Sequence, residues 1–471
     1  MTGTHLPPRE QVRIILIRPG SEDISVSGSR GALALPTLSI PAYSRHAEEV
    51  TGALLRFCDA ETYCLFTLPS DSAARPSHHY SFSCLSHRGK FSPPEFHWMD
   101  RVSMAREDFA DERDFAALRA GFGLIDRCRR EPRAGYFGRP GWLEEITEWT
   151  GFELARHGLQ LTGTFSQLNA SATSSLVRFE TDASAVWFKA TGEPNRRELP
   201  VTQYLAEHFP DYVPPLIGTH RNSKGWLTIE VPGSHLNGDS DHGAWIVAAE
   251  ALAEFQRKTV GHALHLSGAG CNDVRPRALA GFVKPFLEVM GELMDEQRKA
   301  SPAPLTKQEL DSLENLLFDA LSATEALDLP SALVNLDFNL GNIIAGSGRV
   351  TFLDWASGAI GNPFYSFEYL KEQLRTARPT DRSLETEVSE VYLRSWRSCL
   401  GEGVLEEALA LAPLLAAFSY AASGGTWCDP ARRRDPASAG HLRSMARRMK
   451  REGELWASKG PKPRNLDPQP R

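Results

Sequence analysis

The chain has 471 residues, a length that allows roughly two to four domains. Apolar residues make up 41% of it and charged residues 24%, which is ordinary for a soluble globular protein, and the net charge of −7 argues against a general nucleic-acid binder. We expect no membrane span and no signal peptide. The seven cysteines form no C-x-x-C pair, which predicts reduced thiols in a cytoplasmic protein rather than disulfides or zinc.

The first 150 residues predict a small α/β domain. Strands are expected at 12–17, 63–68 and 79–85, and helices at 44–58, 108–119 and 143–157. The Pro- and Ser-rich stretch 69–77 predicts a loop, and the Arg-, Gly- and Pro-rich stretch 129–140 predicts a linker. We therefore place a domain boundary near residue 150.

From residue 151 onward the pattern changes to a few strands followed by many helices. Strands are expected at 161–165, 176–179, 185–189 and 225–231, with a helix at 197–208. Helical apolar spacing then recurs at 245–258, 310–321 and 404–421. This order predicts an α+β part with a β-rich lobe over 151–235, a helical lobe over 236–455 and a ligand cleft between them. A Pro-rich tail over 456–471 is expected to be disordered.

Three polar residues near apolar strands point to chemistry. Asp337 and Asn342 lie in the segment 333–344, and Asp354 follows the apolar run 350–353. Carboxylates beside buried strands are costly unless they hold a metal or a substrate proton. Phosphoryl transfer needs such a set, because a carboxylate orients the attacking hydroxyl and oxygen ligands hold magnesium on the phosphates.

The stretch from Asp337 to Asn342 resembles the catalytic loop of the aminoglycoside phosphotransferase family, whose typical form is His-Gly-Asp-(four residues)-Asn. The resemblance implies a bilobal, protein-kinase-like phosphotransferase fold that uses ATP and Mg²⁺. It implies Asp337 as the catalytic base, and Asn342 and Asp354 as magnesium ligands. Asn335 and Leu336 stand where the family has His and Gly, which puts the geometry of this loop in question.

Six upstream residues fit the nucleotide half of the same family site: Lys189, Glu198, Ser171, Ser174, Glu230 and Val231. The lysine ends an apolar strand and resembles the family lysine that holds the α- and β-phosphates, with the glutamate as its partner. The two serines lie in a glycine-free loop at the phosphate-loop position. The last two residues resemble the hinge whose backbone meets adenine. A surface lysine and a glutamate favoured by the first turn of a helix are the structural alternatives.

The N-terminal region weakly resembles a worn Nudix box, Arg-Glu-U-x-Glu-Glu-x-Gly, in which U is a bulky aliphatic residue. Arg45, Glu49 and Gly52 match, but His46 and Val50 replace two metal-binding glutamates. One glutamate cannot gather magnesium around a diphosphate, so we expect an inactive Nudix-like domain. An unrelated amphipathic helix is the alternative.

Three further groups of residues are less informative. The cluster of His78, His79, Cys84 and His87 matches no common zinc spacing, and we expect it to bind no metal. The basic residues from 432 to 451 predict either a solvated face or a site for an anion. Glu368, Glu372 and Asp429 could add negative charge to an acceptor cleft.

The resulting hypothesis is an ATP-dependent phosphotransferase that acts on a hydroxyl of a small molecule and binds neither nucleic acid nor membrane. The main alternative is a nucleotide-binding pseudokinase with a regulatory role, favoured by Asn335, Leu336 and the glycine-free loop. Nudix-type hydrolysis is a third and weaker option. The sequence indicates neither the acceptor nor the oligomeric state.

Overall fold

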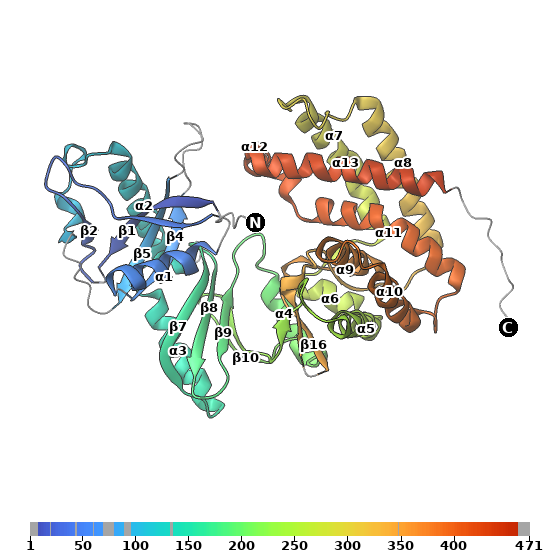
Figure 1. The fold of residues 1–471 in the computed structure, drawn as a ribbon, viewed down its shortest axis with the longest axis horizontal. Coiled ribbons are helices and arrows are strands. Elements are labelled where there is room, and N and C mark those ends of the chain that lie inside the picture. The colour runs from blue at the N-terminus through green and yellow to red at the C-terminus, as the bar shows by residue number, and fades with distance from the viewer. Residues whose placement is uncertain are drawn as a thin grey trace, which may run out of the picture. The chain divides into compact units, whose positions relative to one another are not determined.

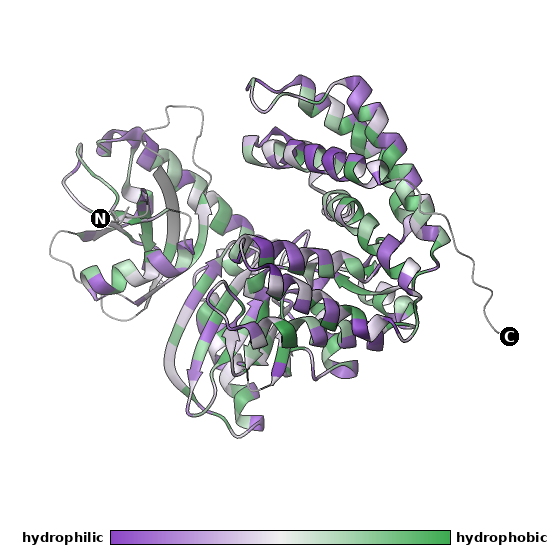
Figure 2. Ribbon diagram, turned by 45° about the vertical axis from the view of Figure 1, so that its right-hand side comes forward, coloured by the Kyte–Doolittle hydropathy of each residue, from purple (hydrophilic) through white to green (hydrophobic). Residues whose placement is uncertain are grey.

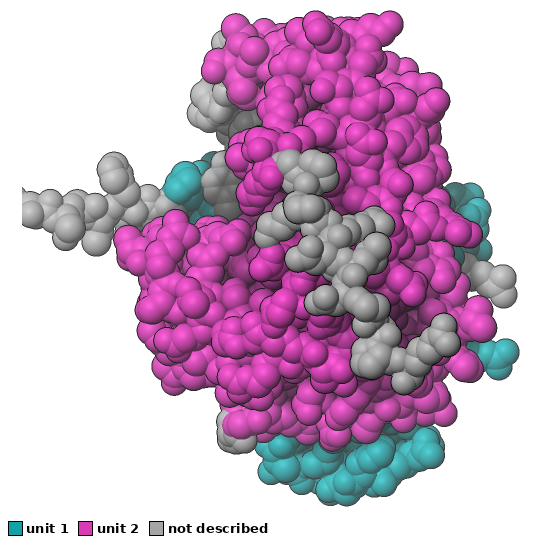
Figure 3. Space-filling model, turned by 90° about the vertical axis from the view of Figure 1, so that its right-hand side faces the viewer, with its two compact units in different colours: residues 1–199, 215–230 teal, residues 200–214, 231–471 magenta. Residues whose placement is uncertain are grey.

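The computed structural model describes residues 8–18, 20–42, 45–59, 61–68, 80–88, 96–131, 135–346 and 348–459. The chain divides into two compact units, the first comprising 1–199 and 215–230 and the second 200–214 and 231–471 (Figure 1 and Figure 3). The predicted loop at 69–77, His78, His79 and residues 460–471 of the predicted tail lie outside the described residues, as do the side chains of Cys84 and His87. Residues 456–458, also predicted to be disordered, instead form the end of a helix.

The first unit begins with a six-stranded sheet in the order β4-β5-β1-β2-β6, with β3 beside β1. Its strands are β1 (Arg9–Ile17), β2 (Ile24–Val26), β3 (Thr37–Pro41), β4 (Glu61–Leu68), β5 (Tyr80–Arg88) and β6 (His97–Met99). Strand β1 runs parallel to β5, and the other pairs are antiparallel. Helix α1 (His46–Cys58) buries Ala47, Val50 and Leu54 in a cluster with residues of β1. The Nudix-like interpretation of this region stays a prediction.

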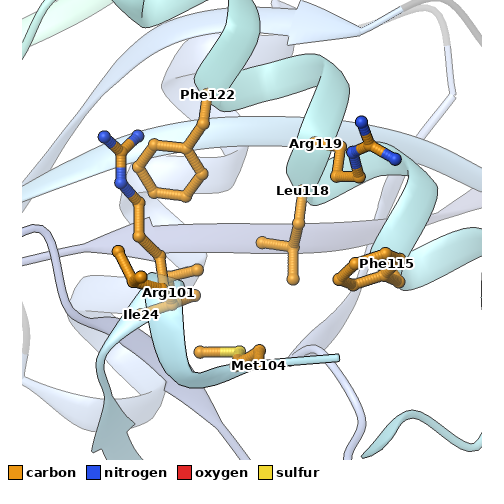
Figure 4. Close-up of a pocket in the computed structure, with 8 residues that line it drawn as sticks. Ile24, Arg101, Met104, Phe115, Leu118, Arg119 and Phe122 are labelled. Carbon is orange, nitrogen blue, oxygen red and sulfur yellow. The ribbon is translucent and has the colours of Figure 1, made fainter. Parts of the chain in front are cut away.

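Helix α2 (Glu112–Arg130) and helix α3 (Trp142–Arg156) follow, after the short helices η1 (Arg101–Ser103) and η2 (Arg106–Asp108). The stretch predicted as a linker instead contains η3 (Tyr136–Gly138), whose three residues are all buried. A cavity of about 270 Å³ lies against α2. Figure 4 shows side chains that line it, with Leu118 extending toward Met104. None of the predicted site residues lines it.

A second, five-stranded antiparallel sheet completes the first unit, in the order β10-β11-β9-β8-β7. It consists of β7 (Leu161–Ala170), β8 (Ser175–Thr181), β9 (Val186–Ala190), β10 (Leu216–His220) and β11 (Gly225–Ile229). Val177 and Phe188 of this sheet lie in one hydrophobic cluster with Tyr63 and Trp142 of the N-terminal region. The packing is therefore continuous across residue 150, where the sequence suggests a boundary.

The second unit is mainly helical. Its helices are α4 (Glu198–His208, whose first two residues belong to the first unit), α5 (His242–Thr259), α6 (Ala263–Ala269), α7 (Pro276–Asp295), α8 (Lys307–Ala326), α9 (Phe364–Ala377), α10 (Arg382–Trp396), α11 (Glu402–Ser423), α12 (Pro430–Arg434) and α13 (Pro436–Ser458). Figure 2 shows hydrophobic and hydrophilic residues alternating along these helices, as expected for amphipathic elements that share a core.

Two three-stranded sheets lie within this helical unit. One has the order β12-β15-β16, formed by Ser234–His235, Ile343–Gly346 and Arg349–Phe352. The other has the order β13-β17-β14, formed by Asn272–Asp273, Gly358–Gly361 and Ala332–Asn335. Three short helices, η4 (Leu340–Asn342), η5 (Trp355–Ser357) and η6 (Thr426–Cys428), complete the unit. Strands β14, β15 and β16 flank the predicted catalytic residues.

Among the described residues, one helix, α11, is long and apolar enough to cross a membrane by length and composition, which corrects the expectation of no such run. It contacts α9 and α13, and 61% of its most apolar window is buried inside the unit. Leu411, Leu415 and Phe418 are fully buried. This burial is typical of the central helix of a packed core.

Candidate functional site

Asp337 stands between two buried anchors. It follows β14, whose four residues are all buried, and its neighbours Leu336 and Phe338 are 2% and 3% exposed. The Phe338 ring lies 5.7 Å from that of Phe352, which fixes the downstream side of the loop. Leu336, in place of the glycine typical of the family, is therefore a core residue that holds the loop while Asp337 itself is exposed.

Asn335 joins the two predicted catalytic segments. Its Oδ1 accepts a hydrogen bond from the backbone N–H of Asp337 at 3.0 Å, and its Nδ2 donates to the carbonyl of Asp354 at 2.8 Å. The side chain is buried, and its own backbone is bonded on both sides by the Ser366 hydroxyl. An amide offers one donor and one acceptor in a fixed geometry, so a residue that departs from the family pattern still connects both aspartates.

Asn342 and Asp354 come together at the end of the next hairpin. The Leu353 N–H donates to the Asn342 carbonyl at 2.8 Å, which sets Asn342 beside Asp354, and Asn342 Nδ2 donates to the Asp337 carbonyl at 3.3 Å. Asp354 has a left-handed backbone with φ 57°. Such strain in a non-glycine residue is concentrated at functional sites. An amide oxygen and a carboxylate are hard donors of the kind that Mg²⁺ prefers.

The electrostatics of Asp337 favour proton uptake. Desolvation by the surrounding loop raises the pKa of Asp337, and the negative charge of Asp354 raises it further, against a hydrogen bond from Asn339 that lowers it. A carboxylate whose pKa is raised accepts a proton more readily, which suits a general base. Burial raises the pKa of Tyr420, and the charge of Asp337 adds to the rise. Sequence patterns offer no signal for Tyr420.

The nucleotide half of the predicted site contains a close ion pair. Lys189 Nζ lies 2.6 Å from Glu198 Oε1, with side-chain exposures of 24% and 2%. The lysine sits in β9 beside Trp226 of β11, and the glutamate is the first residue of α4. The pairing that the sequence predicts is therefore present, and its partly buried setting strengthens a charge-assisted bond.

Ser171 and Ser174 form a tight turn, which we call the Ser171–Ser174 turn. Their hydroxyl oxygens are 2.7 Å apart, and Ser171 Oγ accepts hydrogen bonds from the N–H groups of Thr173 and Ser174. The structure thus brings the two predicted phosphate-binding hydroxyls together. It also shows that two of the amides expected to cover phosphates are already bonded within the turn.

Glu230 is held in the sheet. Its carboxylate accepts two bonds from Arg178, at 2.7 and 2.8 Å, and one from Trp187 Nε1 at 3.0 Å. These bonds, with that of Arg178 the largest, lower the pKa of Glu230 despite partial burial. Its N–H donates to the Ala185 carbonyl at 2.9 Å, so a backbone contact to adenine through Glu230 would use its carbonyl. Val231, the next residue, is where the chain returns to the second unit.

The acidic residues predicted near the acceptor are paired with cations. Both carboxylate oxygens of Glu372 accept from Arg448, at 2.8 and 2.7 Å. Glu368 is 3% exposed and pairs with Lys371 at 2.7 Å, and Asp429 caps α12. Within the described residues, no three His, Cys, Asp or Glu side chains gather as a metal site. The magnesium prediction therefore depends on one amide and one carboxylate.

No family model and no curated protein matches the chain. Several solved structures do. A macrolide 2'-phosphotransferase from Brachybacterium faecium is 17% identical over 63% of this chain and 98% of its own, with a TM-score of 0.41. An ethanolamine kinase from Plasmodium vivax is 14% identical over 64% and 85%, with a TM-score of 0.45. A choline kinase from Cryptosporidium parvum is 12% identical over 72% and 97%, with a TM-score of 0.46. Because these identities and TM-scores are low, the candidate site rests on the contacts within the chain itself.

Proposed function

We propose that this chain is an ATP-dependent phosphotransferase that moves the γ-phosphoryl group to a hydroxyl of a small molecule. The observation that carries the proposal is the double hydrogen bond of Asn335, which joins the backbones of Asp337 and Asp354. Asp354 also has a left-handed backbone, and strain of this kind clusters at functional sites. The Lys189–Glu198 pair adds the cation that phosphates require.

Each residue has a role that its chemistry supports. Asp337 orients the acceptor hydroxyl and takes its proton, and Lys189 binds phosphate oxygens while Glu198 fixes its ammonium group. Asn342 and Asp354 would hold Mg²⁺, which neutralises phosphate charge when bound. The hydroxyl oxygen attacks the γ-phosphorus, and the bond to the β-phosphate oxygen breaks, so that ADP leaves. The chemical identity of the acceptor stays open.

The test is turnover of ATP with a panel of small hydroxyl compounds in the presence of Mg²⁺. We expect phosphorylation of at least one compound by the wild type, and a loss of about a hundredfold or more in Asp337→Asn. Thr162→Val, an exposed change on β7, is the control and should leave turnover unchanged. Equal turnover by the wild type and Asp337→Asn would contradict the assigned role.

The second candidate is a nucleotide-binding module without turnover. Asn335, Leu336 and the absence of glycine from the Ser171–Ser174 turn favour it, because they depart from the pattern of the family that the catalytic segment resembles. Thermal-shift titration separates the two functions. Stabilisation by ATP that does not depend on Mg²⁺, with no phosphorylated product from any acceptor, would favour the module over the enzyme.

A further inference from the structure

The Ser171–Ser174 turn lacks the glycines that usually let a phosphate loop bend and approach its ligand. Its own serine hydroxyl fixes it from inside. From outside, the N-terminal region (residues 8–159) contacts strand β7, which leads into the turn, at Gln167 and Ala170, and it contacts the turn itself at Ala172. All these residues belong to the first unit.

Gln167 of β7 is bonded to the backbone of β4. Its Oε1 accepts from the Cys64 N–H at 2.7 Å, and its Nε2 donates to the Cys64 carbonyl at 3.0 Å. The side chain is 2% exposed, and Nε2 also reaches Ser175 Oγ at 3.3 Å. This buried amide makes the two hydrogen bonds that a neighbouring strand would make to the backbone of Cys64. Its loss leaves that N–H and that carbonyl unpaired.

Ala170, one residue before the turn, packs against the hydrophobic cluster beneath α1. This cluster contains Val50 and Leu54, and α1 and β7 are in direct contact. The strand that leads into the turn is therefore covered by the N-terminal helix. Burial of this kind restricts the strand without any ligand present.

The turn itself is held at Ala172. Its carbonyl accepts a hydrogen bond from the Phe137 N–H of η3 at 3.1 Å. A methyl group on Gly138 would lie 3.2 Å from Ala172 Cβ and 2.6 Å from Cys128 Sγ, so η3, α2 and the turn pack without spare room. The stretch predicted as a linker is the contact surface for the turn.

We propose that the N-terminal region positions the Ser171–Ser174 turn for nucleotide phosphates, and that Gln167 is a positioning residue for the phosphotransfer proposed above, on which this inference rests. In most phosphate loops glycines permit the required shape, whereas here packing from the N-terminal region imposes it. A loop ordered before the ligand arrives loses little conformational entropy on binding, so the contacts raise the affinity for phosphates. This gives the N-terminal region a role that needs no catalytic residues of its own.

The experiment compares Gln167→Met, which keeps the size of the side chain and removes its hydrogen bonds, with Thr162→Val on the same strand. Among the residues that the structure describes, Thr162 Oγ1 bonds only to the Glu180 carbonyl of the adjoining strand, at 3.3 Å. Calorimetry with ATP and Mg²⁺, and separately with adenosine, measures affinity, and amide hydrogen exchange measures the order of the turn. We expect Gln167→Met to bind ATP about tenfold more weakly, to bind adenosine like the wild type, and to exchange faster at residues 172–174. Thr162→Val should match the wild type in all three.

Ala172→Gly serves as the second variant if Gln167→Met does not fold, because this substitution removes one methyl group and alters no core residue. Unchanged exchange in these variants would overturn the contact-imposed shape of the turn. Equal weakening for ATP and adenosine would overturn the phosphate-positioning role, because general damage to the fold affects both. A wild type that binds no nucleotide would overturn the proposed function and the positioning with it. If the wild type binds ATP and Gln167→Met binds it equally well, only the positioning is overturned.

Discussion

Asn335→Leu tests whether one buried amide holds the two acidic segments in register. The substitution keeps the volume of the side chain but removes its hydrogen bonds to the Asp337 N–H and the Asp354 carbonyl. Each lost bond costs about 1–2 kcal/mol, so the second unit should lose about 2–4 kcal/mol of unfolding free energy. For a unit of this size that corresponds to a fall in Tm of about 4–16 °C. A shift of about 1 Å in Asp337 would also lower kcat roughly a hundredfold.

The control is Gln256→Leu. Gln256 is 1% exposed, donates to the Pro363 carbonyl at 2.9 Å and accepts from Tyr392 at 2.6 Å, so its loss breaks two buried bonds outside the segment from Asn335 to Asp354. Differential scanning fluorimetry should show a similar fall in Tm for both variants, whereas kcat, measured well below both midpoints, should fall only in Asn335→Leu. Asn335→His, which keeps one donor and one acceptor, should recover part of the lost kcat. Equal kcat in Asn335→Leu and Gln256→Leu would refute the reasoning.

Three further predictions concern Glu198, Asp337 and Tyr63. Glu198→Gln removes the anion that fixes Lys189, and the affinity for ATP in a calorimetric titration should fall about tenfold; an unchanged affinity would count against the pair. The pKa of Asp337 is raised in the folded state, so the ionised carboxylate is less favourable there than in the unfolded chain. The stability that Asp337 contributes below its unfolded-state pKa is therefore lost as pH rises through its folded-state pKa. Asp337→Asn should therefore have a higher Tm than the wild type at pH 8, with the gap closing toward pH 4, and a lower Tm at pH 8 would contradict this. Tyr63→Phe removes two buried hydrogen bonds at 2.7 and 2.9 Å and should cost about 1–3 kcal/mol in urea denaturation, whereas a loss below about 0.5 kcal/mol would show that they are not needed.

Elements with strong local patterns were predictable. The apolar strand that carries Lys189 is found as Val186–Ala190, and the helix that begins with Glu198 is found as Glu198–His208. Both depend on periodicity and on residues a few positions apart, which sequence displays directly. Helix α2 was only partly predicted, because glycines follow Arg119, yet the helix continues to Arg130 and buries Gly121 against the core.

Contacts between distant positions could not be predicted in this way. The density of Arg, Gly and Pro around residues 129–140 indicates turns, but only the fold reveals that Phe137 meets Ala172. In the sequence, Asn335 is visible only as a departure from a pattern. Its hydrogen bonds join it to residues two and nineteen positions along the chain, and the sequence does not display them. Hydrogen bonds of that kind depend on tertiary placement rather than on local propensity, so a motif comparison marks the residue without explaining it.

The shared core of the first unit limits how this chain can be divided. A chain shortened to begin near residue 150 would lose Tyr63 and Trp142, and with them part of the cluster that buries Val177 and Phe188. Such a fragment would present bare apolar surface to solvent and aggregate. Gene fusion and domain exchange work where a chain can be cut without opening a core. The N-terminal region and the sheet that it covers therefore share one core, and changes in either must be accommodated by the other.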